Sequence, residues 1–235
     1  MAEESFIPAL IVVDLQNDFC PGGSLAVEDG DKTVPVINHL LTLPAFALRV
    51  ATLDWHPQDH ISFASNHPGK KPFVDTALVI NPKNSDEKYV TQLWPDHCVQ
   101  ESHGAELVKG FDPDALVDKK IKKGTNKDVE MYSAFYDPFT NPRISDSGLA
   151  SYLKSPPESV PITHVYVVGL AADYCVCCTA LDAVKEGFVT YIVEEGTRAV
   201  SAPHWTEKRA ELLAAGVKIV SKDGPEVACL SAKKA

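Results

Sequence analysis

Apolar and polar residues follow two different periods along this chain, and the two patterns alternate. Continuous apolar runs rich in β-branched residues, such as ALIVVDL, are typical of buried strands, whereas apolar residues spaced three or four positions apart favour amphipathic helices. Strands are expected over 9–15, 46–55, 115–124, 164–171, 189–196 and 217–220, and helices over 31–42, 145–154, 173–187 and 204–216. This alternation predicts an α/β fold, a doubly wound three-layer α/β/α arrangement with a mainly parallel six-stranded sheet.

The connection between the second and third expected strands is unusually long. Residues 56–114 show little helical periodicity and are rich in Pro, His, Asn and Asp. A long segment without regular structure inside a compact domain is usually functional. Because the 235 residues contain no repeat and no evident linker, we expect one domain over 1–235, in which this connection carries part of the binding site.

Charge and cysteine content narrow the choice of partner and compartment. A net charge of −10 argues against binding to nucleic acid, which usually requires a basic surface. No stretch is apolar enough to span a membrane, so we expect no membrane partner. The six cysteines are irregularly spaced, unlike a disulfide framework, and indicate free thiols in an intracellular, cytoplasmic protein.

Four polar or reactive residues stand where expected strands end. Asp14, Asp54, Lys123 and Cys175 each follow an apolar run. In a doubly wound fold, ligands bind at the carboxyl ends of the parallel strands. These four side chains are therefore the first candidates for chemistry.

Three cysteines lie close together after the fourth expected strand. Cys175 lies near the start of the following helix, with Asp173 as its expected N-cap, and a cysteine there tends to have a lowered pKa and to act as a nucleophile. Cys177 recurs with the apolar positions of the helix and is expected in the core, while Cys178 is ambiguous. The spacing of Cys175 and Cys178 also suits a redox pair, although the surrounding thioredoxin-like pattern is absent.

A thiol nucleophile needs a base and a group that handles charge. Asp14 would lie beside Cys175, because the first and fourth strands are neighbours in the usual doubly wound order. A strand-end Asp can equally cap the following turn. Lys123 belongs to the basic run KKIKK, whose lysines could simply be solvated charges.

Histidines in the long connection suggest a metal site. Asp54 and His56 lie two positions apart at a strand end, where a period of two points both side chains the same way, and His97 follows later in the connection. One carboxylate and two imidazoles suit Zn²⁺, Mn²⁺ or Fe²⁺. His60 and His67 could also contribute, and the Asp54–His56 pair could instead be ordinary loop polarity.

Taken together, these residues make the chain resemble the nicotinamidases, also called pyrazinamidases, of the isochorismatase-like cysteine hydrolase superfamily. The resemblance is greatest to the eukaryotic type. The matching segments are IVVDLQNDFCPGGSL, DWHPQDHISF, LWPDHCVQ, KKGTNKDVEMYSAFYD and VYVVGLAADYCV, which fall in the family's order over residues 10–176. The resemblance implies hydrolysis of nicotinamide to nicotinate and ammonia through a cysteine thioester, in NAD salvage. Two alternatives are a related amidohydrolase that acts on another small amide and a non-catalytic metal-binding protein of this fold.

The resemblance also assigns roles to particular residues. It implies a catalytic triad of Asp14, Lys123 and Cys175, and a divalent metal, with Zn²⁺ favoured, on Asp54, His56 and His97. His60 matches a histidine that binds the metal in some relatives only.

The substrate pocket is assigned in the same way. The resemblance implies a cis peptide bond between Leu170 and Ala171, an oxyanion hole formed by the backbone N–H groups of Ala171 and Cys175, and a ring-binding pocket walled by Phe19, Trp94 and Tyr132. Homo-oligomers are compatible with the resemblance.

Overall fold

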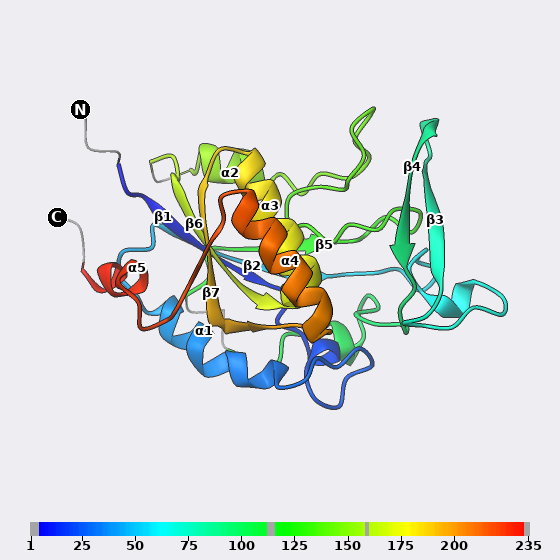
Figure 1. Ribbon diagram of the computed structural model, residues 1–235, viewed down its shortest axis with the longest axis horizontal. Coiled ribbons are helices and arrows are strands. Elements are labelled where there is room, and N and C mark those ends of the chain that lie inside the picture. The colour runs from blue at the N-terminus through cyan, green and yellow to red at the C-terminus, as the bar shows by residue number, and fades with distance from the viewer. Residues whose placement is uncertain (1–4, 112–115, 158–159, 233–235) are drawn as a thin grey trace.

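The computed structural model describes residues 5–111, 116–157 and 160–232. Its centre is a six-stranded sheet in the order β5-β2-β1-β6-β7-β8, in which every neighbouring pair is parallel (Figure 1). The strands are β1 (Pro8–Val13), β2 (Leu48–Asp54), β5 (Lys119–Lys123), β6 (His164–Leu170), β7 (Val189–Arg198) and β8 (Lys218–Val220). The predicted parallel six-stranded sheet is confirmed.

Helices cover both faces of this sheet. They are α1 (Val34–Leu41), α2 (Leu149–Lys154), α3 (Cys177–Lys185), α4 (Ala202–Ala214) and the short α5 (Pro225–Ala228), which the sequence pattern did not predict. Leu10 and Val12 of β1 pack in a core cluster with α1 and α5, whereas Ala9, Ile11 and Val13 pack in a second cluster with α2, α3 and α4. Alternate residues of one buried strand thus pack into two cores, one on each face of the sheet. The sheet and the helices on its two faces are the three layers of the fold.

The third expected strand is shorter than its apolar pattern suggested. It was expected over 115–124 and is observed as Lys119–Lys123. Residue 115 and the last residues of the expected connection, 112–114, lie outside the described residues.

The long connection contains regular structure that was not expected. An antiparallel hairpin is formed by β3 (Thr76–Asn81) and β4 (Asn84–Gln92), and it stands to one side of the main sheet (Figure 1). Along β3, buried and exposed residues alternate strictly, as in a strand with one covered face. The hairpin is anchored through Tyr89 of β4, whose hydroxyl donates to the Glu130 carbonyl oxygen at 2.7 Å.

The start of the helix after β6 differs from the expectation. Residues Ala172–Val176 form a π-helical turn, and regular α-helix begins only at Cys177. Asp173 lies inside this turn and is not an N-cap, because its carboxylate accepts hydrogen bonds from the backbone N–H groups of Val200 and Ser201. It ties the π turn to the segment before α4, so the turn is held by tertiary contacts and not by a local cap.

In the ranges given above, no helix combines the length and the apolar character that crossing a membrane requires.

Candidate active site and metal centre

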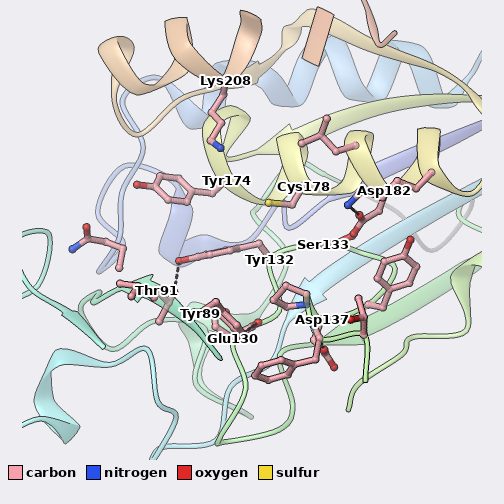
Figure 2. A pocket seen from close by; sticks show the side chains of 18 of the residues that line it. Tyr89, Thr91, Glu130, Tyr132, Ser133, Asp137, Tyr174, Cys178, Asp182 and Lys208 are labelled. Atoms are coloured by element: carbon pink, nitrogen blue, oxygen red, sulfur yellow. Dashed lines mark hydrogen bonds and ion pairs between the residues drawn. The ribbon is translucent and has the colours of Figure 1, made fainter. Parts of the chain in front are cut away.

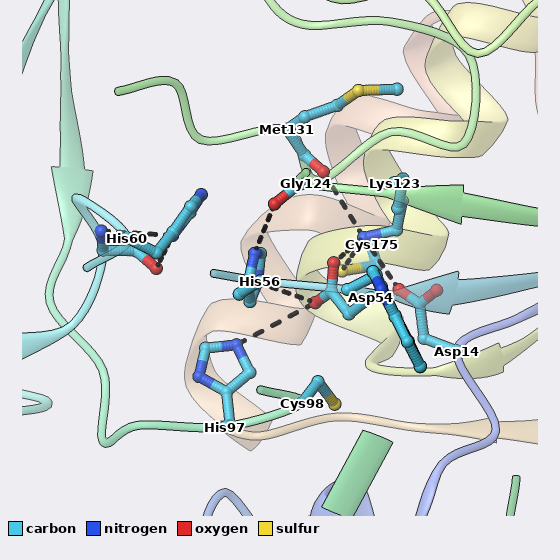
Figure 3. Close-up of polar contacts among 12 residues, drawn as sticks. Asp14, Asp54, His56, His60, His97, Cys98, Lys123, Gly124, Met131 and Cys175 are labelled. Carbon is cyan, nitrogen blue, oxygen red and sulfur yellow. Dashed lines mark hydrogen bonds and ion pairs between the residues drawn. The ribbon is translucent and has the colours of Figure 1, made fainter. Parts of the chain in front are cut away.

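The four strand-end residues meet at the carboxyl edge of the sheet, around the ammonium group of Lys123 (Figure 3). Lys123 Nζ lies 2.9 Å from Asp14 Oδ2, 2.7 Å from Asp54 Oδ1 and 3.4 Å from Cys175 Sγ. Strands β5, β2, β1 and β6 are adjacent in the sheet, so their ends bring these side chains together. Lys123 is 1% exposed, which rules out a solvated lysine on a basic surface.

Two carboxylates keep this buried lysine charged. Burial alone would lower the pKa of Lys123, but Asp14 and Asp54 outweigh it and raise the pKa well above its ordinary value. Burial would likewise raise the pKa of Asp54, yet Lys123 outweighs it and holds that pKa below its usual range. Lys123 and Asp54 therefore form a fully buried ion pair.

Asp14 is held in a strained backbone conformation next to the thiol. Its φ is +46°, which is uncommon for a residue other than glycine. The Thr52 hydroxyl donates a hydrogen bond of 2.6 Å to Asp14 Oδ1. Burial raises the pKa of Asp14, and the Asp54 carboxylate adds to this, while Lys123 opposes it. A carboxylate with a raised pKa is a better proton acceptor, which suits a general base.

The Cys175 thiol has the opposite pKa shift from the one expected for a helix N-terminus. Burial, with the neighbouring Asp14 and Asp54 carboxylates, raises the pKa of Cys175 well above its ordinary value, although Lys123 acts against it. Burial is the largest of these effects, and it opposes the lowered pKa that a helix N-terminus favours. The resting cysteine is therefore a neutral thiol that needs a base before it can attack.

The other cysteines differ from Cys175 in position. Cys177 is 1% exposed and packs in the core, as expected. Cys178 is partly exposed and lines a separate cavity. All six cysteines lie in the described part of the chain and are free thiols, so Cys175 and Cys178 do not form a disulfide here.

Asp54, His56 and His97 form a cluster fitted to a divalent cation. One ligand atom of each lies within 4.8 Å of the others, and Asp54 Oδ2 is 3.4 Å from His56 Nε2 and 3.9 Å from His97 Nε2. Nδ1 of His56 bonds the Gly124 carbonyl oxygen, and Nδ1 of His97 that of Pro95, each at 2.8 Å. A carbonyl partner places the proton on Nδ1, which leaves Nε2 as a lone pair facing Asp54.

Three further observations fit a metal ion at this cluster. His56 Nε2 is buried and has no hydrogen-bond partner among the described residues. Burial lowers the pKa of His97 to about 4, so its imidazole is neutral and free to act as a ligand at neutral pH. Gly124, at φ +65°, leaves room for the ring of His56, because a Cβ atom there would lie 2.4 Å from His56 Cε1.

His60 does not point a free nitrogen at this cluster. Its Nδ1 bonds the Ser62 hydroxyl at 2.8 Å and its Nε2 lies 3.2 Å from the Val129 carbonyl oxygen. The ring stacks on His56 with centroids 4.0 Å apart. His67 Nε2 bonds the Ile61 carbonyl oxygen at 2.7 Å, so both histidines already have partners within the connection.

A small aromatic cavity opens beside Cys175. Ten residues line it: Phe19, Leu25, Asp54, Trp94, His97, Tyr132, Ala171, Tyr174, Cys175 and Val200. Hydrogen bonds hold the side chains of this wall in place. Trp94 Nε1 donates to the Tyr132 hydroxyl at 2.9 Å, and the same hydroxyl bonds Thr91 Oγ1 at 3.0 Å. The peptide bond between Leu170 and Ala171 is cis, as the resemblance implies.

A larger cavity of about 520 Å³ adjoins this one (Figure 2). Tyr132 and Tyr174 belong to the walls of both cavities, and the outer one extends between β4, the 130–143 segment and helices α3 and α4. Tyr174 was not singled out from the sequence. Its ring lies 4.8 Å from that of Trp94 and 5.5 Å from that of Tyr132, measured between centroids.

Gln16 is a second residue that the sequence pattern did not reveal. Its side-chain amide donates to the Asp54 carbonyl oxygen and accepts from the Asp54 N–H, each at 2.8 Å, and it is fully buried. Gln16 thus fixes the backbone of Asp54, whose carboxylate lies between Lys123 and the two histidines. The quoted stretch IVVDLQNDF contains it, but a glutamine after a strand has no distinctive signal of its own.

Comparison with known proteins identifies the family. A model of the isochorismatase domain matches residues 8–223. The chain is 43% identical over 219 residues to a nicotinamidase of Acinetobacter baylyi, covering 91% of this chain and 92% of that one. Yeast nicotinamidase bound to the inhibitor nicotinaldehyde superposes with a TM-score of 0.84 at 35% identity, covering 92% of this chain and 100% of the other. A pyrazinamidase of Pyrococcus horikoshii in complex with zinc has a TM-score of 0.68 at 36% identity, covering 91% and 98%. The chain therefore belongs to the isochorismatase family.

Proposed function

We propose that this protein is an amidase that hydrolyses nicotinamide to nicotinate and ammonia. The observation that carries the proposal is the buried Lys123 ammonium, within 3.4 Å of the Cys175 thiol and paired with Asp14, at the edge of an aromatic cavity. A nicotinamidase is also 43% identical to this chain over 91% of its length, which supports the same reaction.

The first half of the proposed reaction forms a thioester. Asp14 takes the proton of the Cys175 thiol as the sulfur bonds to the carboxamide carbon, and the carbonyl oxygen becomes an oxyanion. The N–H groups of Ala171 and Cys175 stabilise this oxyanion, by about 3 kcal/mol for each donor. The carbon–nitrogen bond then breaks, and Asp14 returns the proton to the leaving nitrogen, which departs as ammonia.

The second half reverses these roles with water as the nucleophile. Asp14 takes a proton from a water molecule that attacks the thioester carbon. The carbon–sulfur bond breaks, Asp14 returns the proton to the sulfur of Cys175, and the product loses its carboxyl proton to solvent and leaves as nicotinate. Lys123 remains charged throughout and balances the negative charge that moves between Asp14 and the thiolate.

Asp54, His56 and His97 would hold the divalent metal, and Zn²⁺ suits two imidazoles and one carboxylate. When bound, the metal supplies a Lewis acid that positions the pyridine nitrogen of the substrate. Phe19, Trp94 and Tyr132 would enclose the ring, so pyrazinamide, which has nearly the same shape, should also be hydrolysed. The free cysteines and the proposed product support a cytoplasmic enzyme of NAD salvage.

Ammonia release by the purified protein tests this function. Wild-type protein supplied with Zn²⁺ or Mn²⁺ should release ammonia from nicotinamide, and Cys175→Ala should release none. Cys178→Ala, a matched change three positions away, should keep its activity. Absence of release by the wild type would contradict the nicotinamidase assignment, while turnover by Cys175→Ala would contradict the thioester mechanism. Activity on a carbamoyl compound alone would favour a related amidohydrolase.

A further inference from the structure

The small aromatic cavity beside Cys175, the inner cavity, is too small for the proposed substrate in this structure. Its volume is about 20 Å³, which is room for about one water molecule. A pyridine ring with its carboxamide needs several times that volume, so part of the wall must move before such a ring can enter. The outer cavity, of about 520 Å³, lies behind two of the wall residues, Tyr132 and Tyr174.

Most of the apolar wall of the inner cavity is fixed by its packing. Phe19, Leu25 and Trp94 are at most 5% exposed and belong to the same core cluster as α1. Tyr132 is held by the two hydrogen bonds of its hydroxyl. Val200 is partly exposed but does not line the outer cavity, so the outer cavity offers it no space to move into.

Tyr174 differs from these residues because one side of it is free. Its side chain is partly exposed, and within the described ranges its hydroxyl has no hydrogen-bond partner. Its ring lies between Trp94 of the inner wall and His204 of the outer wall, with the centroids 4.8 Å apart on each side. Rotation of this side chain would carry the ring into the outer cavity, at whose edge it lies (Figure 2).

The backbone around Tyr174 need not move with the ring. The preceding residue, Asp173, is buried, and its carboxylate accepts hydrogen bonds from two backbone N–H groups. The following residue, Cys175, is 5% exposed and packs in the second core cluster. A change of rotamer at Tyr174 can therefore open the inner cavity while the nucleophile stays in place.

We propose that the Tyr174 side chain is a gate between the two cavities and limits the substrate to a single-ring carboxamide. This proposal rests on the proposed amidase function. Asp54 and His97 line the inner cavity and not the outer one, so a ring with its nitrogen on the metal side turns its opposite edge towards Tyr132 and Tyr174. Nicotinamide leaves Tyr174 room to pack against that edge. A second ring fused there would occupy the place of the tyrosine ring itself.

Alkylation of Cys175 tests the gate without relying on turnover. Iodoacetamide forms a carbon–sulfur bond to a thiol and releases iodide and a proton, and peptide mass spectrometry measures the rate at each cysteine. Tyr174→Ala removes the closed state and should speed alkylation of Cys175 about tenfold or more, as expected when the open state is a minor one. The rate at the exposed Cys229 should stay that of the wild type. Equal Cys175 rates in wild type and Tyr174→Ala would overturn the gate.

Substrate selectivity tests the limit on size. Isoquinoline-4-carboxamide carries a second ring on the edge of the pyridine away from the nitrogen. Its kcat/KM relative to that of nicotinamide should rise about tenfold or more in Tyr174→Ala. Tyr152→Ala, the same change at a partly exposed tyrosine of α2 that lines neither cavity, should keep the wild-type ratio. A wild-type ratio in Tyr174→Ala would overturn the role in specificity.

A second variant covers the case in which Tyr174→Ala does not fold, as judged by circular dichroism. Tyr174→Val should then show the same two changes, and wild-type values of both in that variant would overturn the proposal.

The outcomes also separate this gate from the proposed function. Wild-type protein that hydrolyses nicotinamide, together with Tyr174→Ala of unchanged alkylation and selectivity, would refute the gate alone. Wild-type protein that hydrolyses no carboxamide would refute the proposed function and with it the limit on substrate size. Alkylation of Cys175 would still decide whether Tyr174 closes the inner cavity.

Discussion

Thr52 shows how a residue outside the triad can set the state of a catalytic base. Its hydroxyl donates to Asp14 Oδ1 at 2.6 Å in a fully buried setting. This bond favours the ionised form of Asp14, the form that accepts a proton. Thr52→Val removes the bond and keeps the shape of the side chain, so less of Asp14 is ionised and kcat/KM should fall roughly tenfold, as expected for losing a hydrogen bond to a charged group. Steady-state kinetics of ammonia release would measure the fall.

A matched variant tests whether the fall comes from Asp14. Thr190 is also a buried threonine on a strand, β7. Its hydroxyl donates to the carbonyl oxygen of Phe188, the residue just before that strand, at 3.1 Å. Thr190→Val should leave kcat/KM unchanged. A loss of equal size in both variants would show that general destabilisation, and not the base, explains the effect.

Gly124 supports the metal site because it has no Cβ atom, which leaves space for the ring of His56. Gly124→Ala would bring a Cβ to 2.4 Å from His56 Cε1 and would strain a backbone with φ +65°. Metal affinity, measured by chelator competition, should fall at least tenfold because the His56 ring must move. Gly148, at φ +75°, has no atom within 4 Å of an added Cβ, so Gly148→Ala carries only the backbone strain and should bind metal normally.

The position of the nucleophile could be read from the sequence, but its chemical state could not. Cys175 follows a strongly apolar run and precedes a helical pattern, which places it at the carboxyl edge of the sheet. The pKa of its thiol depends on how deeply the tertiary structure buries it and on Asp14 and Asp54, which come from other strands. The local sequence predicts the helix and its dipole, but it does not predict how far tertiary packing removes water from the thiol.

At the scale of elements, the same limit explains the β3–β4 hairpin. The central strands β1 and β6 are almost continuous apolar runs because both of their faces are covered, and these strands were predicted. The hairpin is covered on one face only and leaves Leu78, Ile80 and Val90 exposed. Its second strand, β4, is mostly polar, so the pair gives only a weak strand pattern. Its turn, NPKN, looked like part of a loop.

Glu87 should make the attachment of this hairpin sensitive to acid. Its carboxylate accepts from the Thr140 N–H and hydroxyl, the Asn141 N–H and the Asn81 amide. Loss of hydration alone would raise the pKa of Glu87, but these bonds outweigh it and lower the pKa from 4.5 to about 2. Because the folded-state value is depressed, the stabilisation is complete above about pH 4.5 and is lost as the pH falls towards 2.

Unfolding measurements at two pH values would check this. Glu87→Gln should unfold at a lower urea concentration than the wild type at pH 6, and the difference should shrink at pH 3. A difference that stays constant or grows on acidification would contradict the assigned hydrogen bonds.

At the scale of the whole molecule, the candidate metal residues connect parts of the chain that are far apart. Asp54 ends β2 in the sheet, whereas His97 lies in the long connection, 43 positions later. Metal binding should therefore stabilise the fold as a unit, by about 2.7 kcal/mol when free metal is at 100 times its Kd. For a chain of this size that corresponds to a rise in Tm of roughly 5–10 °C.

Calorimetry with and without a chelator would measure this shift. Stripping the metal should lower the Tm of the wild type by that amount and leave the Tm of His97→Ala almost unchanged. A wild-type Tm that does not respond to the chelator would contradict a structural contribution of the metal. The expectation of one domain over 1–235 stays a prediction, and a single calorimetric transition would support it.

Asp54 has one oxygen on Lys123 and the other towards the two histidines. An engineer who wished to build a metal-independent version of this protein could not begin at Asp54, because any replacement would also unbalance the lysine that touches the nucleophile. His97, which contacts only the metal side of that carboxylate, is where the two functions can be varied separately. The shared carboxylate thus restricts which mutational routes, natural or designed, can change the metal dependence of the site without losing the chemistry.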